Sequence, residues 1–401
     1  MAADTSVKYF HSAMTGAPTL NGTVGSLIGV LDACLVNGFG LVTLDSLVIS
    51  GGIATATRAA GHSAEVGAVI AIAGATVTGG TVNGNQKVLS ANATQFTFDA
   101  TGISNQTATG TITAKLAAAG WTKLFSGTNL AAYKSADVAT TGCVLRVDDT
   151  NTTVALVKAF ETMSDINTGT GQFPTSGQIG TGLQWSKSST ANATANPWML
   201  VADGRFFYFA RAYRGGNNAT QINDYELTVF GDFLPTKSSG DAYGCVISGP
   251  MSGQTGANVT DTSNYWYGQS GTASGLYCPR SYTALGSSLS MGKSYPTPNS
   301  QATPGCSGAN SNGIPFPNPT DGGLYVVPHY LFEAPNGNSN NVLRGTSPGF
   351  YCTPQNIPNS MFAPRDTVTG VTGLVGKTLK ALTCQSTTQG LVLFDITGPW
   401  R

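Results

Sequence analysis

Hydrophobic and polar residues alternate in short runs along most of the chain, which is the period that places apolar side chains on one face of a β-strand. Between residues 46 and 115, six or seven such runs recur about every ten residues, separated by glycines. Ile53–Thr57 and Gln95–Phe98 are typical runs, and Asn83-Gly84 predicts a type I′ turn. This stretch therefore predicts a small β-sandwich or barrel.

The clearest hairpin of the longer remainder joins Trp198–Ala202 to Arg205–Phe209. Asp203-Gly204 lies between the two runs and suits a two-residue turn, in which both central residues take positive φ angles. Because strand side chains alternate, Phe206 and Tyr208 are expected on one face of the sheet, with Trp198 buried.

One segment has a helical period instead. Ser26–Val36 is bounded by Ser26, which can cap its first turn, and by Asn37-Gly38, which can end it. Its apolar residues recur at three- and four-residue spacing and share one face: Leu27, Val30, Leu31, Cys34 and Leu35. So short a helix must pack against the rest of its own chain or against a neighbouring subunit. We expect Leu27, Val30, Leu31 and Leu35 to form a subunit interface.

These patterns divide the chain into three units. Residues 1–45 are predicted to be an N-terminal anchoring segment, 46–115 a small β module, and 116–401 a larger β-rich domain. Within the third unit, residues 250–322 are rich in Ser, Gly, Asn and Pro and predict long loops. Tyr265, Trp266 and Tyr267 stand inside these loops, where they could pack beneath them, anchor a subunit interface or contact a glycan. The fold class is therefore mainly β, with several sandwich or barrel modules and one short helix.

Composition narrows the functional classes. Hydrophobic residues make up 41% of the chain, which excludes disorder, and the 51 glycines have no three-residue period, which excludes collagen. Charged residues are only 10%, with 20 basic and 20 acidic, so a role in binding nucleic acid is disfavoured. A surface this poor in charge favours a homo-oligomer, for which a trimer is the leading hypothesis.

The sequence predicts neither a secretion signal nor a membrane span. The first residues lack a basic start followed by an apolar stretch, and residues 66–80 are too short and too rich in Gly and Thr to span a membrane. We expect a chain made in the cytoplasm without a membrane partner. Its seven cysteines are odd in number and form no CxxC pair, which predicts mostly buried free thiols, with Cys278, Cys306 and Cys352 as the candidate exceptions.

Candidate chemistry is weak throughout. Residues 371–378 resemble a phosphate loop, but Val371 stands where the first glycine is required. The three histidines have unlike surroundings and no GxSxG motif is present, so a nucleophilic triad is not predicted. The turn 148–152 could offer oxygens to Ca²⁺, although a plain hairpin turn is favoured. Acids that could pair for glycoside hydrolysis are Asp148, Asp149, Glu161, Asp203, Asp232 and Asp241. The sequence thus predicts no enzyme, no cofactor and no metal site.

Two sets of residues carry a resemblance to known proteins. Residues 46–115 resemble a small β module that recurs in tail and fibre proteins of tailed bacteriophages, through His62, Val66-Gly67, Gly74-Ala75, Asn83-Gly84 and Phe96-Thr-Phe98. The larger part resembles an uncharacterised family of phage virion structural proteins. The matching segments are Gly120–Phe125, Gly142–Asp148, Glu161–Asp165, Phe230–Asp232, Gly240–Tyr243 and Phe394–Trp400.

The resemblance implies a structural component of a tailed-phage virion, assembled in the cytoplasm of the bacterial host. The tail, the baseplate or a fibre-like appendage is the expected location, since the small module recurs there. Two alternatives stay open: a capsid decoration or head-spike protein, and an adhesin or depolymerase that binds host surface glycan. The expected partners are other virion proteins and further copies of the chain. The resemblance carries no catalytic residues.

Overall fold

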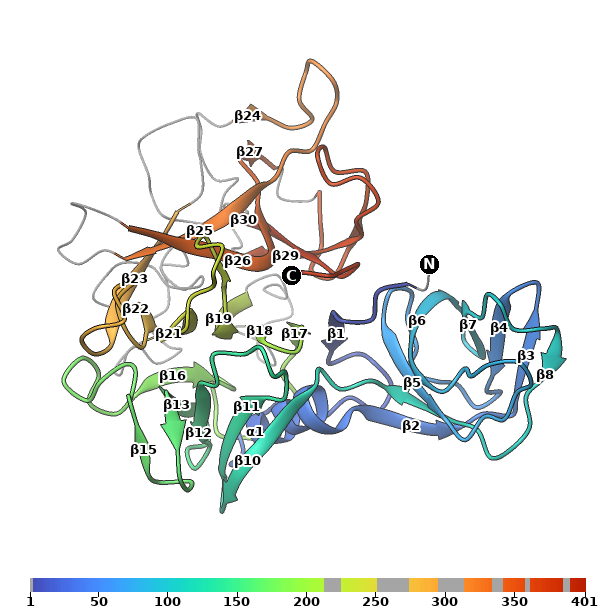
Figure 1. The fold of residues 1–401 in the computed structure, drawn as a ribbon, viewed down its shortest axis with the longest axis horizontal. Coiled ribbons are helices and arrows are strands. Elements are labelled where there is room, and N and C mark those ends of the chain that lie inside the picture. The colour runs from blue at the N-terminus through green and yellow to red at the C-terminus, as the bar shows by residue number, and fades with distance from the viewer. Residues whose placement is uncertain are drawn as a thin grey trace.

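Nearly all regular structure in this computed structural model is β-strand (Figure 1). The structure describes residues 3–212, 225–250, 274–294, 314–333, 342–357, 361–384 and 390–401. Within these ranges the only helices are α1 (Ser26–Leu31) and the π-helix η1 (Asp32–Asn37), which continues it. The mainly-β prediction with one short helical segment is therefore confirmed.

A separate lobe, on the right in Figure 1, is one curled antiparallel sheet of eight strands. The strand order is β2-β9-β5-β6-β7-β4-β3-β8. The sheet curls so far that Thr76 and Thr109 exchange backbone hydrogen bonds. The strands are β2 (Phe39–Thr43), β3 (Ser46–Ser50), β4 (Ile53–Thr57), β5 (Val69–Ala73), β6 (Gly84–Ala91), β7 (Gln95–Asp99), β8 (Gln106–Thr107) and β9 (Thr113–Leu116). We call residues 39–116 the small module.

The predicted strands of the small module are present, but two details of the prediction are wrong. The module begins at Phe39 rather than at residue 46, because β2 pairs with β9. Asn83-Gly84 does not form a two-residue turn, since residues 74–83 separate β5 from β6. The Asn83 side chain instead bonds both backbone groups of Ala75, at 3.0 and 2.7 Å, and so holds that longer loop.

The rest of the chain, which we call the body, is built around a 13-stranded antiparallel sheet. Its order is β1-β17-β18-β19-β21-β22-β23-β25-β26-β30-β29-β28, with β20 paired to β26. The strands are β1 (Lys8–His11), β17 (Trp198–Ala202), β18 (Phe206–Ala212), β19 (Tyr225–Asp232), β20 (Leu234–Pro235), β21 (Cys245–Pro250), β22 (Ser274–Cys278), β23 (Leu289–Ser294), β25 (Val327–Glu333), β26 (Val342–Cys352), β28 (Thr367–Val368), β29 (Leu379–Cys384) and β30 (Gly390–Asp395).

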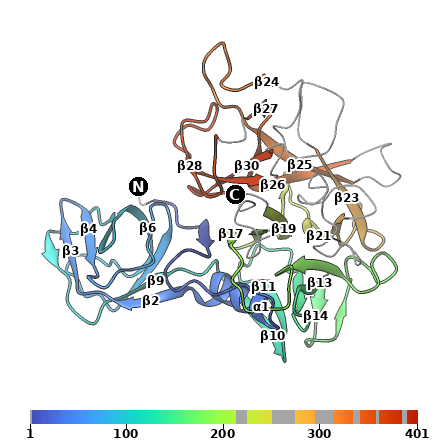
Figure 2. The same cartoon turned by 180° about the vertical axis from the view of Figure 1, so that it is seen from behind.

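A second sheet of the body has five strands in the order β10-β11-β12-β13-β16. They are β10 (Trp121–Gly127), β11 (Leu130–Ser135), β12 (Val144–Asp148), β13 (Val154–Phe160) and β16 (Leu183–Ser186). Two strand pairs complete the body: β14 (Thr162–Met163) with β15 (Gly169–Thr170), and β24 (Ile314–Pro315) with β27 (Gln355–Asn356). Figure 2 shows the same layers from behind, with the small module now on the left.

Strand β18 lies between two aromatic layers. Phe207 contacts Trp121 and Trp185 of the five-stranded sheet, at ring-centroid distances of 5.3 and 5.9 Å. On the opposite face, Tyr208 stacks on Phe350 at 5.3 Å. Phe206 lies 4.9 Å from Tyr208, so their predicted common face is confirmed, and Trp198 is buried as predicted. Every residue of β18 is buried, because both faces of this strand are covered.

The predicted hairpin between β17 and β18 exists with a different turn. β17 ends at Ala202 and β18 begins at Phe206, so three residues link the strands rather than two. Neither Asp203 nor Gly204 has a positive φ angle. The carboxylate of Asp203 instead accepts the backbone N–H groups of Arg205 and Phe206, at 2.8 and 2.7 Å. A side chain, rather than backbone handedness, therefore closes this turn.

The predicted anchoring segment 1–45 does not exist as a unit. Strand β1 pairs along its length with β17 inside the large sheet, and the residues from Phe39 onward belong to the small module. One continuous hydrophobic core runs through both lobes. The predicted loop region 250–322 also contains strands β22, β23 and β24. A chain shortened to begin near residue 47 would lose the edge strand β1 of the large sheet, the helix and β2 together.

Candidate functional site

The predicted interface on the helix is in fact part of the protein's own core. The apolar face has 0% exposure throughout: Leu27, Val30, Leu31, Cys34 and Leu35. The helix begins inside the body, where the Asp149 carboxylate accepts the N–H groups of Leu27 and Ile28 at 2.8 and 3.1 Å. Ser26 makes no cap and its hydroxyl bonds the Asn21 carbonyl oxygen instead. A neighbouring subunit therefore cannot reach this face, and the interface prediction for these residues is wrong.

Asp149 is also half of a fully buried ion pair with Lys187, and both side chains have 0% exposure. The Lys187 ammonium donates two further bonds, to the carbonyl oxygens of Thr23 and Asn151, each at 2.7 Å. Burial raises the pKa of Asp149 and lowers the pKa of Lys187. The adjacent Asp148 contacts Arg146 and accepts the Thr150 hydroxyl instead, so the turn 148–152 is a braced hairpin turn. Among the described residues, no group of three or more His, Cys, Asp or Glu side chains could hold a metal ion.

The predicted aromatic anchors Tyr265, Trp266 and Tyr267 lie outside the described residues.

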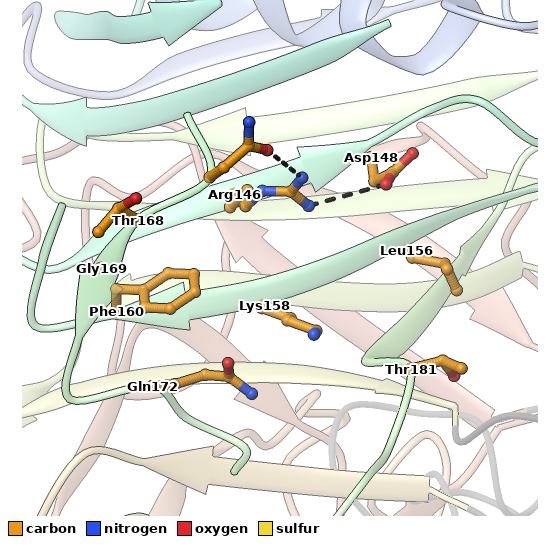
Figure 3. Close-up of a pocket in the computed structure, with 10 residues that line it drawn as sticks. Arg146, Asp148, Leu156, Lys158, Phe160, Thr168, Gly169, Gln172 and Thr181 are labelled. Carbon is orange, nitrogen blue, oxygen red and sulfur yellow. Dashed lines mark hydrogen bonds and ion pairs between the residues drawn. The ribbon is translucent and has the colours of Figure 1, made fainter. Parts of the chain in front are cut away.

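A polar groove of about 490 Å³ opens on the outer face of the five-stranded sheet (Figure 3). Strands β12 and β13 form its floor, and the β14–β15 hairpin and the loop that follows form its walls. Figure 3 shows Arg146 and Lys158 side by side on neighbouring strands. The lining residues are Arg146, Asp148, Leu156, Lys158, Phe160, Asn167, Thr168, Gly169, Gln172 and Thr181.

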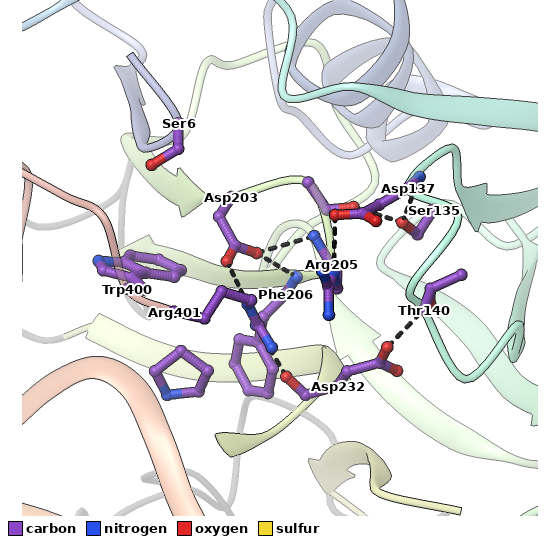
Figure 4. A network of polar contacts seen from close by, with 12 residues as sticks. Ser6, Ser135, Asp137, Thr140, Asp203, Arg205, Phe206, Asp232, Trp400 and Arg401 are labelled. Carbon is purple, nitrogen blue, oxygen red and sulfur yellow. Dashed lines mark hydrogen bonds and ion pairs between the residues drawn. The ribbon is translucent and has the colours of Figure 1, made fainter. Parts of the chain in front are cut away.

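A second polar cluster braces the middle of the body (Figure 4). Arg401, the last residue, bonds the Asp203 carboxylate at 2.7 Å and the Asp232 carbonyl oxygen at 2.9 Å. The Asp232 carboxylate accepts the hydroxyls of Thr140 and Thr141 at 2.8 and 2.6 Å. Burial raises the pKa of Asp232, against the lowering effect of these bonds. The cluster ties the chain end, the β17–β18 turn and the five-stranded sheet together.

The other acids predicted as possible glycosidase residues are also engaged in ion pairs or hydrogen bonds. Arg344 is buried and holds Asp241 at 2.6 Å, and it also pairs with Glu333. Arg280 makes a two-pronged contact with Glu161, at 2.7 and 2.8 Å. Each of the six acids predicted as possible glycosidase residues is thus engaged by a cation, a backbone N–H group or a hydroxyl. Of the six, only Asp148 lines the polar groove.

Two of the three histidines make contacts that hold the fold together. His11 lies beside Tyr9 at a ring distance of 5.4 Å and contacts Glu65 at 2.9 Å, which joins β1 to the small module. His329 hydrogen-bonds Ser347 at 2.8 Å, but both side chains are buried, at 2% and 4% exposure. A substrate cannot reach that pair.

Four cysteines are free and buried, as predicted: Cys34, Cys143, Cys245 and Cys278. Cys352 is buried as well, at 3% exposure. Of the three suspected exceptions, Cys278 is therefore an ordinary core thiol. Burial raises the pKa of Cys278 to about 12, so the reactive thiolate is scarce at neutral pH. Cys306 and the side chain of Cys384 lie outside the described residues.

Sequence reasoning missed Lys158 and Lys187. Lys158 follows the apolar run Val154–Val157 and alternates in phase with Leu156, which places it on the outer face. Lys187 directly follows β16. That alternation could have identified the exposed position. The partner on the neighbouring strand depends on register, which the sequence of one strand does not contain.

Comparison with known proteins finds no matching family model and no matching curated protein. Within the described part of the chain, no helix is both long and apolar enough to cross a membrane. Any function must therefore be inferred from the residues and contacts above.

Proposed function

We propose that this chain is a structural component of a tailed-phage virion, located in the tail, the baseplate or a fibre-like appendage. One observation carries the proposal. Every carboxylate in the segments that resemble phage virion proteins bonds a group that stabilises the fold. They are Asp148, Glu161, Asp165, Asp232, Asp241 and Asp395. Carboxylates that all stabilise the fold are typical of a structural protein rather than of an enzyme that turns over a substrate.

The contacts of these acids reach across the fold. Asp241 on the loop after β20 is joined to Arg344 on β26, and Glu161 after β13 is joined to Arg280 after β22. Asp395 at the end of β30 holds Lys377 at 2.9 Å. Partly buried ion pairs with good geometry are costly to break, because separation leaves a charge without a partner. Such pairs favour a rigid fold, which is useful in a virus particle. An acid held in such a pair cannot readily exchange protons with a substrate. We therefore propose that the chain is not an enzyme.

Self-association is the second part of the proposal, with a trimer favoured. The small module exposes apolar side chains on three strands: Leu41 on β2, Val48 on β3 and Leu89 on β6, at 67%, 41% and 45% exposure. A chain with only 10% charged residues has little charge to keep such positions solvated. The small module is thus the surface we propose for contacts with further copies or with other virion proteins. No nucleic acid or membrane partner is proposed.

The decisive experiment is quantitative mass spectrometry of purified phage particles, combined with gold-labelled antibodies against the chain. Three, six or twelve copies per particle with label on the tail would support the tail proposal. Hundreds of copies with label on the head would favour the alternative, a capsid decoration or head-spike protein. Finding the chain only in the soluble lysate, and never in particles, would refute both.

Self-association is tested separately by light scattering on the full chain. A Leu41→Lys, Val48→Lys double variant should shift an oligomer toward monomer. Val375→Lys is the matched control, because Val375 is 97% exposed and belongs to the body rather than to a module strand. A full chain that stays monomeric at micromolar concentration would contradict this part of the proposal.

A further inference from the structure

Two cations face each other across the floor of the polar groove. Arg146 on β12 and Lys158 on β13 are direct cross-strand partners in the antiparallel register. Like charges in directly opposed positions destabilise a sheet. Both side chains belong to the outer face, whereas their neighbours Val147 and Val157 are buried. The fold therefore keeps an unfavourable pair at a position where almost any polar residue could stand.

The surrounding residues compensate only part of this charge. The Arg146 guanidinium donates to two neutral acceptors, the Ile166 carbonyl oxygen at 2.8 Å and the Asn167 amide oxygen at 3.3 Å, and Asp148 lies 3.8 Å away. Asp148 also accepts the Thr150 hydroxyl at 2.7 Å. The Lys158 ammonium has no ion-pair or hydrogen-bond partner among the described residues. With two cations and one carboxylate in its lining, the groove has a net charge of about +1, which matches an anion of single charge.

The remaining lining suits a ligand that carries many hydroxyl groups. Its volume of about 490 Å³ falls within the range of small-molecule sites, roughly 300–1,000 Å³, and far exceeds what an inorganic anion fills. Leu156 and Phe160 on β13 supply the apolar part of the floor. Four side chains add hydroxyl and amide groups that both donate and accept hydrogen bonds: Asn167, Thr168, Gln172 and Thr181.

The groove is held in shape before any ligand arrives. The bond from Arg146 to Ile166 fastens the β14–β15 hairpin to the sheet, and Ala159 bridges to Phe173 on the other wall. The stem of Lys158 lies against Gly182, where an added Cβ would meet its Cγ at 3.1 Å. Preorganisation of this kind reduces the ordering cost of binding.

We propose that this groove binds an acidic saccharide, with the sugar carboxylate placed between Arg146 and Lys158 (Figure 3). Arg146 offers its remaining guanidinium N–H groups and Lys158 its ammonium, while the wall amides and hydroxyls bond the sugar hydroxyls. The inference does not rest on the proposed virion role, because it needs only the isolated chain.

The test is calorimetric titration of the full chain with methyl β-D-glucuronide, with methyl β-D-glucoside and sodium sulfate as comparison probes. Loss of the carboxylate in the glucoside should weaken binding by about tenfold or more, as expected for one charge-assisted contact. Affinity for the glucuronide should fall as salt rises, since this attraction is screened. Lys158→Met should weaken glucuronide binding by about tenfold.

Lys134→Met is the matched control. Lys134 lies on β11 of the same sheet and carries the same charge, but it does not line the groove. This variant should bind the glucuronide like the unaltered chain. Lys158→Met should also keep or raise the melting temperature, because it relieves repulsion from Arg146. A lowered melting temperature, or equal binding by the two variants, would overturn the proposal. Sulfate that displaces the glucuronide at equal concentration would overturn saccharide recognition, because it would reveal a general anion site.

Discussion

The small module and the body of this protein handle charge in opposite ways. Within residues 39–116, all of which the structure describes, the only buried polar or charged side chain is Ser63. Among its described residues, the body buries eleven charged side chains: Lys8, Asp149, Lys187, Asp203, Arg211, Glu226, Asp232, Glu333, Arg344, Lys380 and Asp395. Both lobes are antiparallel β structures, so strand architecture does not require this difference.

The difference follows from how many faces of each sheet are covered. Strands of the small module have one buried and one exposed face, as the alternating exposure of β4 and β7 illustrates. Strands β17, β18 and β19 are covered on both faces, so Arg211 and Glu226 must pair inside the protein, at 3.0 Å. A buried charge is tolerated only with a partner. The body therefore depends on particular pairs, whereas the small module depends on the general burial of apolar side chains.

The largest test of this contrast is Asp149→Ala. The substitution leaves the Lys187 ammonium buried without its carboxylate and removes the cap of α1, so we expect a loss of about 3–5 kcal/mol in the free energy of unfolding. Asp45→Ala in the small module is the control and should cost less than about 1 kcal/mol, because Asp45 is exposed. Urea denaturation measures both. Equal losses would remove the distinction between the lobes.

A second test compares two glycines with positive φ angles. At Gly231, with φ +134°, an added Cβ would lie 2.1 Å from the Arg205 carbonyl oxygen, inside the body. At Gly79 in the small module, with φ +83°, nothing lies within 4 Å. Gly231→Ala should therefore cost about 2–4 kcal/mol through clash and strain, and Gly79→Ala only about 1–2 kcal/mol through strain. Thermal unfolding should rank them in that order, and the reverse order would contradict the packing around β19.

A third test removes the terminal brace. Arg401→Ala deprives Asp203 of its cation and the Asp232 carbonyl of its donor, and should cost about 1.5–3 kcal/mol. Arg58→Ala in the small module breaks only a loose pair with Asp45 at 3.7 Å, and should cost about 0–1 kcal/mol. Denaturant midpoints of the two variants provide the comparison. An Arg401 variant as stable as the Arg58 variant would refute the bracing role.

The smallest test concerns the junction between the lobes, where Lys87 donates to the Ile396 carbonyl oxygen. Burial lowers the pKa of Lys87 from 10.5 to about 8. Because the folded pKa lies below the unfolded value, the unfolded chain binds more protons between them, and stability should rise by about 1 kcal/mol from pH 8 to pH 9. The ¹³Cε resonance, identified by its loss in Lys87→Met, should titrate near pH 8. Titration above pH 10 would place this amine in solvent.

The amino-acid sequence by itself determined the mainly-β class, most strands of the small module and the position of the helix. Alternation in Ile53–Thr57 and Gln95–Phe98 is a local signal, and it survives because each of these strands has one exposed face. The helical period of Ser26–Val36 was equally readable, and so was the burial of isolated cysteines. These properties depend on neighbours a few residues away in the chain.

Only the tertiary structure decided what covers each element. The sequence showed that the helix face with Leu27 and Leu31 must be buried, but only the structure shows that the same chain covers it. Asp149, 122 residues away in the sequence, caps the start of this helix. Asp203-Gly204 suited a two-residue turn, but the turn in the structure is longer. Ala202 pairs with Phe207, and the Asp203 carboxylate binds Arg401. The opposition of Arg146 and Lys158 likewise arose from strand register. Pairing between distant segments is set by the packing of the whole chain, so no local pattern contains it.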